Sequence, residues 1–97
     1  MEILSNNFEL NIFLKKNQYK SIGFVPTMGA IHKGHISLIK TALHENEIAI
    51  CSIYVNPTQF NDVNDFTNYP KKINDDINLL IKHKCSALFI PQNKEIY

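Results

Sequence analysis

Two histidines, His32 and His35, stand three residues apart in a stretch that also carries Gly29 and Gly34. The glycine spacing is that of a phosphate-binding P-loop, G-x-x-x-x-G. His35 and Ile36, however, occupy the places of the Lys and Ser/Thr that a Walker site requires. A Walker-type ATP site is therefore excluded. What remains is a glycine-punctuated loop that leads into a helix.

Paired imidazoles at a helix start are suited to phosphate chemistry. Each ring can donate a hydrogen bond to a phosphate oxygen and stabilise charge that develops there, without the permanent charge of lysine. Free N–H groups and the positive end of the helix dipole favour anions at such a position, and Gly34 keeps a side chain away from the backbone. As a zinc site, the pair supplies too few ligands. An incidental H-x-x-H is the alternative, but the strand–loop–helix context favours a functional pair.

A second polar loop follows the most apolar segment of the chain. It reads NPTQFN over residues 56–61, and Asn56 and Gln59 offer amide donors and acceptors. Such groups suit a small hydroxy acid or an amide better than a redox centre. Ordinary loop chemistry in an Asn-rich chain explains the same residues equally well.

Hydrophobic periodicity predicts three helices and three strands in alternation. Asn6 and Glu9 form a capping-box pattern at the start of the first helix, and Asp75 and Asp76 are expected near the positive N-terminal end of the last. Pro26 is expected to end the first strand, which should be buried. In the second helix, Ile36, Leu38, Ile39, Ala42 and Leu43 should form the buried stripe. The expected elements are a helix over about 6–16, a strand over 22–25, a helix over 34–45, a strand over 48–55, a helix that includes 73–81 and a strand over 87–90.

The alternating order predicts an α/β fold in which a parallel sheet is covered by helices. Three strands make half of a doubly wound, Rossmann-like nucleotide fold. Ligands bind beyond the carboxyl ends of the strands in such sheets. This rule selects the loops after Val25 and after Val55, which are the two loops described above.

The composition of the chain restricts the class of protein further. The chain has 97 residues, 44% hydrophobic and 20% charged, with a formal net charge of +1, which is typical of one globular domain. The absence of a basic excess, with lysine as the sole basic residue type besides histidine, argues against a nucleic-acid partner. The sequence shows no membrane span or secretion signal. Cys51 and Cys85 lie in apolar runs and are expected to be buried free thiols, as in a cytoplasmic protein.

The two loops together resemble those of the pantothenate synthetase (pantoate–β-alanine ligase) family. The resemblance lies in residues 23–30 (GFVPTMGA), in 32–35 (HKGH), and in 55–61 (VNPTQFN) with the Asp-Phe and Tyr-Pro pairs that follow. It extends from about residue 22 to 97. H-x-G-H alone is shared with other nucleotidyl transferases and with class I aminoacyl-tRNA synthetases, whereas the combination with N-P-T-Q-F is highly specific.

The resemblance implies an ATP-dependent, AMP-forming ligase. Pantoate would attack the α-phosphate of ATP, with magnesium carried on the nucleotide, to give pantoyl adenylate, and β-alanine would then displace AMP to form pantothenate. His35 would be the proton donor and His32 its partner on the phosphates. The ATP site would comprise Met28, Gly29, Ala30, Ile31, His32, Lys33, Gly34 and His35. Pantoate and β-alanine would be bound by Gln59, Asn56, Pro26, Thr27 and Met28.

The chain also departs from the family. Members run to more than twice this length, and their G-E-K-D-Y-Q-Q and M-S-S-R-N stretches and the C-terminal lid domain are missing here. Residues 1–97 are therefore expected to form a single, partial nucleotide-binding domain of the H-x-G-H nucleotidyl-transferase type, with little or no activity alone. A homodimer is plausible because the family often dimerises through this half. The alternatives are another H-x-G-H nucleotidyl transferase and a non-catalytic nucleotide-binding or dimerisation module.

Overall fold

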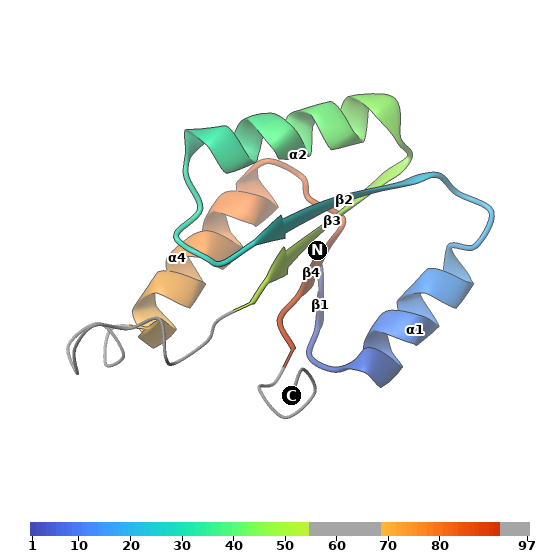
Figure 1. Cartoon of the computed structure of the whole chain (residues 1–97), viewed down its shortest axis with the longest axis horizontal. Helices are drawn as coiled ribbons and strands as arrows, with labels where there is room; N and C mark the ends of the chain where they lie inside the picture. Colours follow the sequence, from blue (N-terminus) through green and yellow to red (C-terminus); the bar gives the residue numbers. More distant parts are fainter. Residues whose placement is uncertain (55–68, 92–97) are drawn as a thin grey trace.

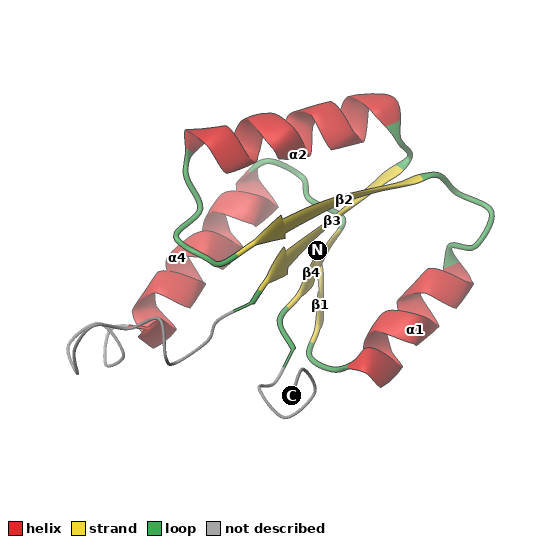
Figure 2. Cartoon of the chain, in the orientation of Figure 1, coloured by secondary structure: helices red, strands yellow, loops and turns green. Residues whose placement is uncertain are grey.

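The computed structural model describes residues 1–54 and 69–91 (Figures 1 and 2). Within these residues, helices and strands alternate, as the sequence predicts, after one additional strand at the N-terminus. The elements are β1 (Glu2–Leu4), α1 (Asn7–Lys16), β2 (Ile22–Thr27), α2 (Lys33–Glu45), β3 (Ile48–Ile53), α4 (Tyr69–Lys82) and β4 (Ala87–Phe89).

The four strands form one parallel sheet in the order β1-β4-β3-β2. The predicted α/β fold with a parallel sheet is confirmed. Strand β1 was not predicted: it is three residues long and pairs with β4, so that Ile3 lies beside Leu88. Strand β3 lies inside the sheet and all six of its residues are buried, as expected for a parallel strand covered on both faces.

Helices cover both faces of the sheet (Figure 2). Helices α2 and α4 pack on one face over the larger hydrophobic cluster, which includes Ile39, Ile53 and Leu80. Helix α1 packs on the other face over a smaller cluster built around Phe13 and Ile50. The sheet thus separates two cores of unequal size.

Helix α1 begins where the capping box predicts. The Asn6 side chain accepts a hydrogen bond from the Glu9 N–H at 2.8 Å. The Glu9 carboxylate accepts in return from the N–H of Ser5, one residue before the cap. Two N–H groups at the helix start are therefore satisfied locally, which explains why this boundary could be predicted.

Strand β2 differs from its prediction in length and burial. It continues through Pro26 to Thr27, because β2 is an edge strand and a proline is tolerated where the N–H has no ladder partner. Phe24, expected in a buried strand, is 56% exposed. Leu38, expected in the buried stripe of α2, is also 56% exposed, whereas Ile36, Ile39 and Ala42 are buried.

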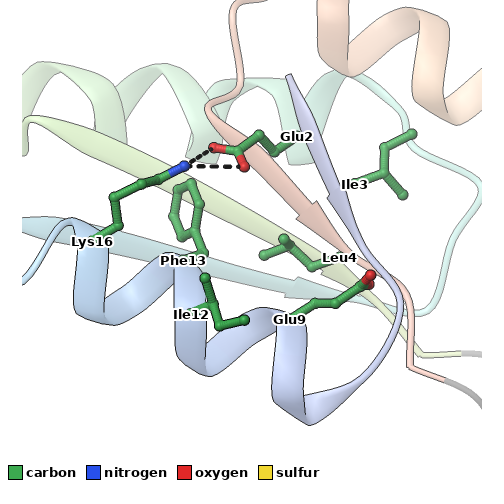
Figure 3. Close-up of a pocket in the computed structure, with 7 residues that line it drawn as sticks. All are labelled: Glu2, Ile3, Leu4, Glu9, Ile12, Phe13 and Lys16. Atoms are coloured by element: carbon green, nitrogen blue, oxygen red, sulfur yellow. Dashed lines mark hydrogen bonds and ion pairs between the residues drawn. The ribbon is translucent and has the colours of Figure 1, made fainter.

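The α1 face also carries a shallow hollow, shown in Figure 3. It lies between β1 and α1, and the exposed Lys16 ammonium spans it to reach both carboxylate oxygens of Glu2, at 3.2 and 3.3 Å. The lining residues are Glu2, Ile3, Leu4, Glu9, Ile12, Phe13 and Lys16.

The two cysteines are buried free thiols, as predicted. Burial raises the pKa of Cys51 to about 12 and also raises the pKa of Cys85. Both thiols are therefore protonated at neutral pH and are poor nucleophiles. Within the described residues, every helix is too short or too polar to span a bilayer.

Candidate functional site

The loop with the two histidines lies at the carboxyl end of β2, where the fold class places ligands. Strand β2 ends at Thr27 and helix α2 begins at Lys33. The Tyr54 N–H donates to the Thr27 carbonyl at 2.9 Å, so the chain that leaves β3 starts beside this loop. Asn56 and Gln59, the candidate residues of the second loop, lie outside the described residues.

Thr27 anchors the start of the loop. Its side chain is buried, and its hydroxyl donates to the Ser52 carbonyl at 2.9 Å while it accepts from the Gly29 N–H at 3.1 Å. Both functions of the hydroxyl are thus engaged within the protein. Pro26 and Met28, the neighbouring candidates for pantoate binding, are exposed on either side of Thr27.

Asp76 of helix α4 holds the middle of the loop. Its Oδ2 accepts from the Ala30 N–H at 3.0 Å, and its Oδ1 accepts from the Ile31 N–H at 2.8 Å. The carboxylate is 4% exposed, and hydrogen bonds to a charged acceptor are the stronger kind. Gly29 and Ala30 both have positive φ, 91° and 55°. For alanine this conformation persists only where the surroundings impose it.

These bonds correct one expectation from the sequence. The N–H groups of Gly29, Ala30 and Ile31 donate to Thr27 and Asp76, so they are not free for a phosphate. The loop backbone therefore serves as a rigid support. The donors available for an anion must come from the side chains that the loop presents and from the start of α2.

The two histidines cap helix α2 with their own side chains. His32 is the N-cap, and its Nδ1 accepts from the Gly34 N–H at 3.0 Å. The Nδ1 of His35 accepts from the His32 N–H at 3.2 Å, which completes a capping box made of imidazoles. The ring centroids lie 4.1 Å apart. The structure thus brings the two imidazoles together at the start of α2.

The capping bonds determine which nitrogens can act as donors. A nitrogen that accepts a hydrogen bond carries no proton, so each neutral ring bears its proton on Nε2. His32 is exposed and His35 is half-buried. The pair therefore offers two Nε2–H donors beside the N-terminus of α2.

The environment favours the neutral form of His35. Burial is the main cause that lowers its pKa below the ordinary value of 6.5, and the neighbouring His32 lowers it further. The carboxylate of Asp76 acts in the opposite direction. At neutral pH His35 is thus an uncharged hydrogen-bond donor. Such a donor can stabilise an oxyanion without carrying a permanent positive charge.

Gly34 has a structural reason that the sequence did not reveal. A Cβ at this position would lie 2.9 Å from Cε1 and 3.2 Å from Nδ1 of His32. Glycine therefore makes room for the imidazole that folds back to cap the helix. The prediction that it clears space for a phosphate is not needed to explain it.

The described residues do not form a metal site. No group of three or more His, Cys, Asp or Glu side chains that could hold an ion occurs within residues 1–54 and 69–91. The Asp76 carboxylate, whose charge acts on His35, already accepts two backbone N–H groups. Magnesium, which prefers several oxygen ligands, therefore does not fit these residues as a resident ion.

Asp76 is the residue that sequence analysis missed. Asp75 and Asp76 were expected near the N-terminal end of their helix, where acids offset the dipole. That expectation is wrong: α4 begins at Tyr69, and its first turn carries no acidic residue. The local signal that could have indicated Asp76 is its position beside Ile77, on the apolar side of an amphipathic helix.

Comparison with known proteins identifies the family of the chain. A family model for Pantoate-beta-alanine ligase matches residues 2–97. The chain belongs to the pantoate-beta-alanine ligase family. The resemblance inferred from the two loop motifs is confirmed, and the match includes the N-terminal strand β1 as well.

Relatives and solved structures of the family give the extent of the match. The chain is 52% identical, over 100 residues, to pantothenate synthetase of Azobacteroides pseudotrichonymphae, and it covers 36% of that protein. It is similar to the crystal structure of pantoate-beta-alanine ligase from Francisella tularensis complexed with beta-gamma ATP and beta-alanine. The TM-score is 0.82 at 47% identity, and the match covers all of this chain and 38% of that one. The crystal structure of pantothenate synthetase from Thermus thermophilus gives a TM-score of 0.79 at 37% identity, with 34% of that chain covered.

The chain therefore spans about a third of the length of the pantoate-beta-alanine ligases that it matches. Its alignment with the first of these relatives covers 100% of the chain. It corresponds to the N-terminal part of the enzyme, the part that contains the H-x-G-H loop.

Proposed function

We propose that this chain supplies the N-terminal half of an ATP-dependent pantoate–β-alanine ligase site, and that residues 1–97 form one partial nucleotide-binding domain. The observation that carries the proposal is the pair of Nε2–H donors on His32 and His35, presented at the carboxyl end of the parallel sheet. The Francisella tularensis relative, whose structure contains beta-gamma ATP and beta-alanine, supports these ligands.

The proposed reaction has two steps. The pantoate carboxylate attacks the α-phosphorus of ATP, so that a P–O bond forms and the bond to pyrophosphate breaks. The amine of β-alanine then attacks the acyl carbon of pantoyl adenylate, AMP leaves with the bonding electron pair, and the amine loses its proton to solvent. The products are pantothenate, AMP and pyrophosphate.

The two histidines would act on the phosphates in the first step. Negative charge moves onto phosphate oxygens as pyrophosphate departs, and donors fixed in advance stabilise that charge without reorganisation. His35, kept neutral by its lowered pKa, would donate from Nε2, and His32 would donate beside it. Residues 28–35 would form one wall of the ATP site.

The remaining assignments follow the family resemblance. Gln59 and Asn56 would bind pantoate and lie near β-alanine, while Pro26, Thr27 and Met28 would shape the pocket. Since the Thr27 hydroxyl is engaged on both sides, its contribution would be shape and support rather than a free donor. Magnesium would arrive on the ATP phosphates, as the family resemblance implies.

We further propose that the isolated chain makes little or no pantothenate, and that it is a cytoplasmic protein that can self-associate as a homodimer. The chain covers 36% of a relative that is 52% identical, so about two thirds of that enzyme lies outside the match. The buried free thiols fit a reducing compartment.

An amide NMR titration of the purified chain with Mg-ATP, and then with pantoate, tests this function. The expected result is dispersed peaks with shifts confined to residues 26–38 and 56–60. His35→Ala should abolish the response, whereas His44→Ala, in the last turn of the same helix, should leave it intact. If the amide shifts occur only outside the H-x-G-H loop, the proposal that this loop binds the nucleotide is wrong.

The low activity is tested separately. Pantoate-dependent exchange of pyrophosphate into ATP should be at background for the isolated chain. Robust exchange would show that the missing part is not needed for adenylation, and would contradict the assignment of a half-site.

A further inference from the structure

We propose that Asp76 is a positioning residue for the histidine pair: its carboxylate clamps the Ala30–Ile31 turn and thereby sets the orientation and tautomer of His32 and His35. This inference rests on the proposed function only in taking the two imidazoles as the phosphate-binding groups. The role in the loop itself stands on contacts between described residues.

Asp76 reaches the histidine loop from a distant part of the chain. It comes from α4, 45 and 46 residues away from the turn it binds, and each carboxylate oxygen accepts one backbone N–H. In the described part of the chain it has no ion-pair partner. A carboxylate that is 4% exposed and satisfied by two loop N–H groups is placed to hold that loop.

The two hydrogen bonds to Asp76 lie where the loop backbone adopts an unfavourable conformation. Gly29 and Ala30 lie at positive φ, and the next residue, Ile31, returns into the core with 7% exposure. The two bonds to Asp76 fall on Ala30 and Ile31, where the chain turns from the exposed loop to the helix start. An alanine at φ 55° would relax to an extended conformation if these bonds were lost.

The Ala30–Ile31 turn leads directly into the two histidines. Ile31 is followed directly by His32, whose backbone N–H donates to Nδ1 of His35 and whose own Nδ1 caps Gly34. A shift of the Ile31 peptide therefore displaces the N–H that keeps His35 in the Nε2–H form. Asp76 also acts on His35 through its charge, which opposes the lowering of the His35 pKa.

The test compares Asp76→Asn with Asp75→Asn, measured without nucleotide. Asparagine keeps the shape of the side chain but offers only one acceptor atom, and Asp75 is the exposed neighbour in the same helix turn. In Asp76→Asn, the Ala30 and Ile31 amides should exchange about tenfold faster or more. The imidazole ¹⁵N shifts of His35 should show mixed tautomers, and its pKa should fall further, since an opposing charge is removed. Asp75→Asn should leave all three unchanged.

The imidazole signature decides the outcome. If the ¹⁵N shifts and the pKa of His35 stay at their wild-type values in a folded Asp76→Asn protein, the positioning role is wrong, whatever the exchange rates show. If that variant does not fold, exchange in the wild-type chain decides: the Ala30 and Ile31 amides should be protected at least about tenfold relative to the unfolded chain. Exchange of both at unfolded rates would overturn the clamp.

A final titration with Mg-ATP separates this inference from the proposed function. If Asp76→Asn binds Mg-ATP about tenfold more weakly while Asp75→Asn binds it normally, the result supports both the positioning role and the proposed function. A wild-type chain that binds no ATP while the His35 signature still responds to Asp76→Asn would contradict the nucleotide site and leave the positioning role in place.

Discussion

The two faces of the sheet differ in how far their charged contacts are exposed to water. On the α2–α4 face, the Asp76 carboxylate is 4% exposed and accepts two backbone N–H groups. On the α1 face, Glu2 meets Lys16 at 3.2 Å, but the two side chains are 52% and 59% exposed (Figure 3). One contact is shielded from water and joins segments far apart in sequence. The other lies in solvent at the edge of a small cluster.

A buried charge can hold a functional loop in place, whereas an exposed ion pair cannot. Exposed ion pairs contribute little because water and salt screen them, and two long side chains must be ordered to form them. A buried carboxylate with matched N–H donors is costly to disturb, so it can hold a loop in an otherwise unfavourable conformation. The candidate site lies on the face that has both the larger core and the buried carboxylate.

The largest expected effect comes from removing the buried carboxylate. Asp76→Ala should lower the free energy of unfolding by about 3 kcal/mol, because two charge-assisted bonds are lost and two N–H groups lose their partner. Urea unfolding measures this. Asp75→Ala, the exposed control, should cost less than about 0.5 kcal/mol. Equal losses in the two variants would show that burial does not distinguish these acids.

A smaller effect is expected where α2 approaches β2. A Cβ on Gly23 would lie 2.7 Å from the Ala42 Cβ and 3.2 Å from its Cα, so Gly23→Ala should cost about 1–3 kcal/mol by overpacking. Thermal or urea unfolding measures the loss. The same substitution should cost less in an Ala42→Gly background, since the nearest atom is gone, and the Asn46 Nδ2, 2.8 Å from the added Cβ, then accounts for part of the remaining cost. A neutral Gly23→Ala would mean that α2 moves away freely.

The smallest effect is expected on the α1 face. Glu2→Gln keeps the shape of the side chain and removes its charge, and it should change the free energy of unfolding by less than about 0.5 kcal/mol. High salt should remove what difference there is. If Glu2→Gln lowered the free energy of unfolding as much as Asp76→Ala does, the proposed difference between the two faces would be wrong.

Much of the fold follows from local patterns. The apolar periodicity of α2 and α4, the unbroken apolar run of β3 and the Asn6–Glu9 cap are all properties of neighbouring residues, so they could be predicted. The H-x-G-H loop could be placed at the end of a strand for the same reason. The parallel sheet then follows from the alternating order of the elements.

Other features could not be predicted because they depend on which segments meet. The pattern of apolar residues predicts which side of an element is buried, but not whether another element covers a given residue. Phe24 and Leu38 were therefore expected inside and are exposed. Strand β1 is too short to have a pattern of its own and exists through its pairing with β4. The capping role of the imidazoles depends on side-chain rotation that spacing does not define.

Residues close together in the chain encode the order of the inner elements, the family and the pair of histidines, so these could be predicted without the fold. The hold of Asp76 on the histidine loop exists only in the folded chain. The carboxylate and the N–H groups it binds are 45 and 46 residues apart, and nothing in either segment alone specifies the other as its partner.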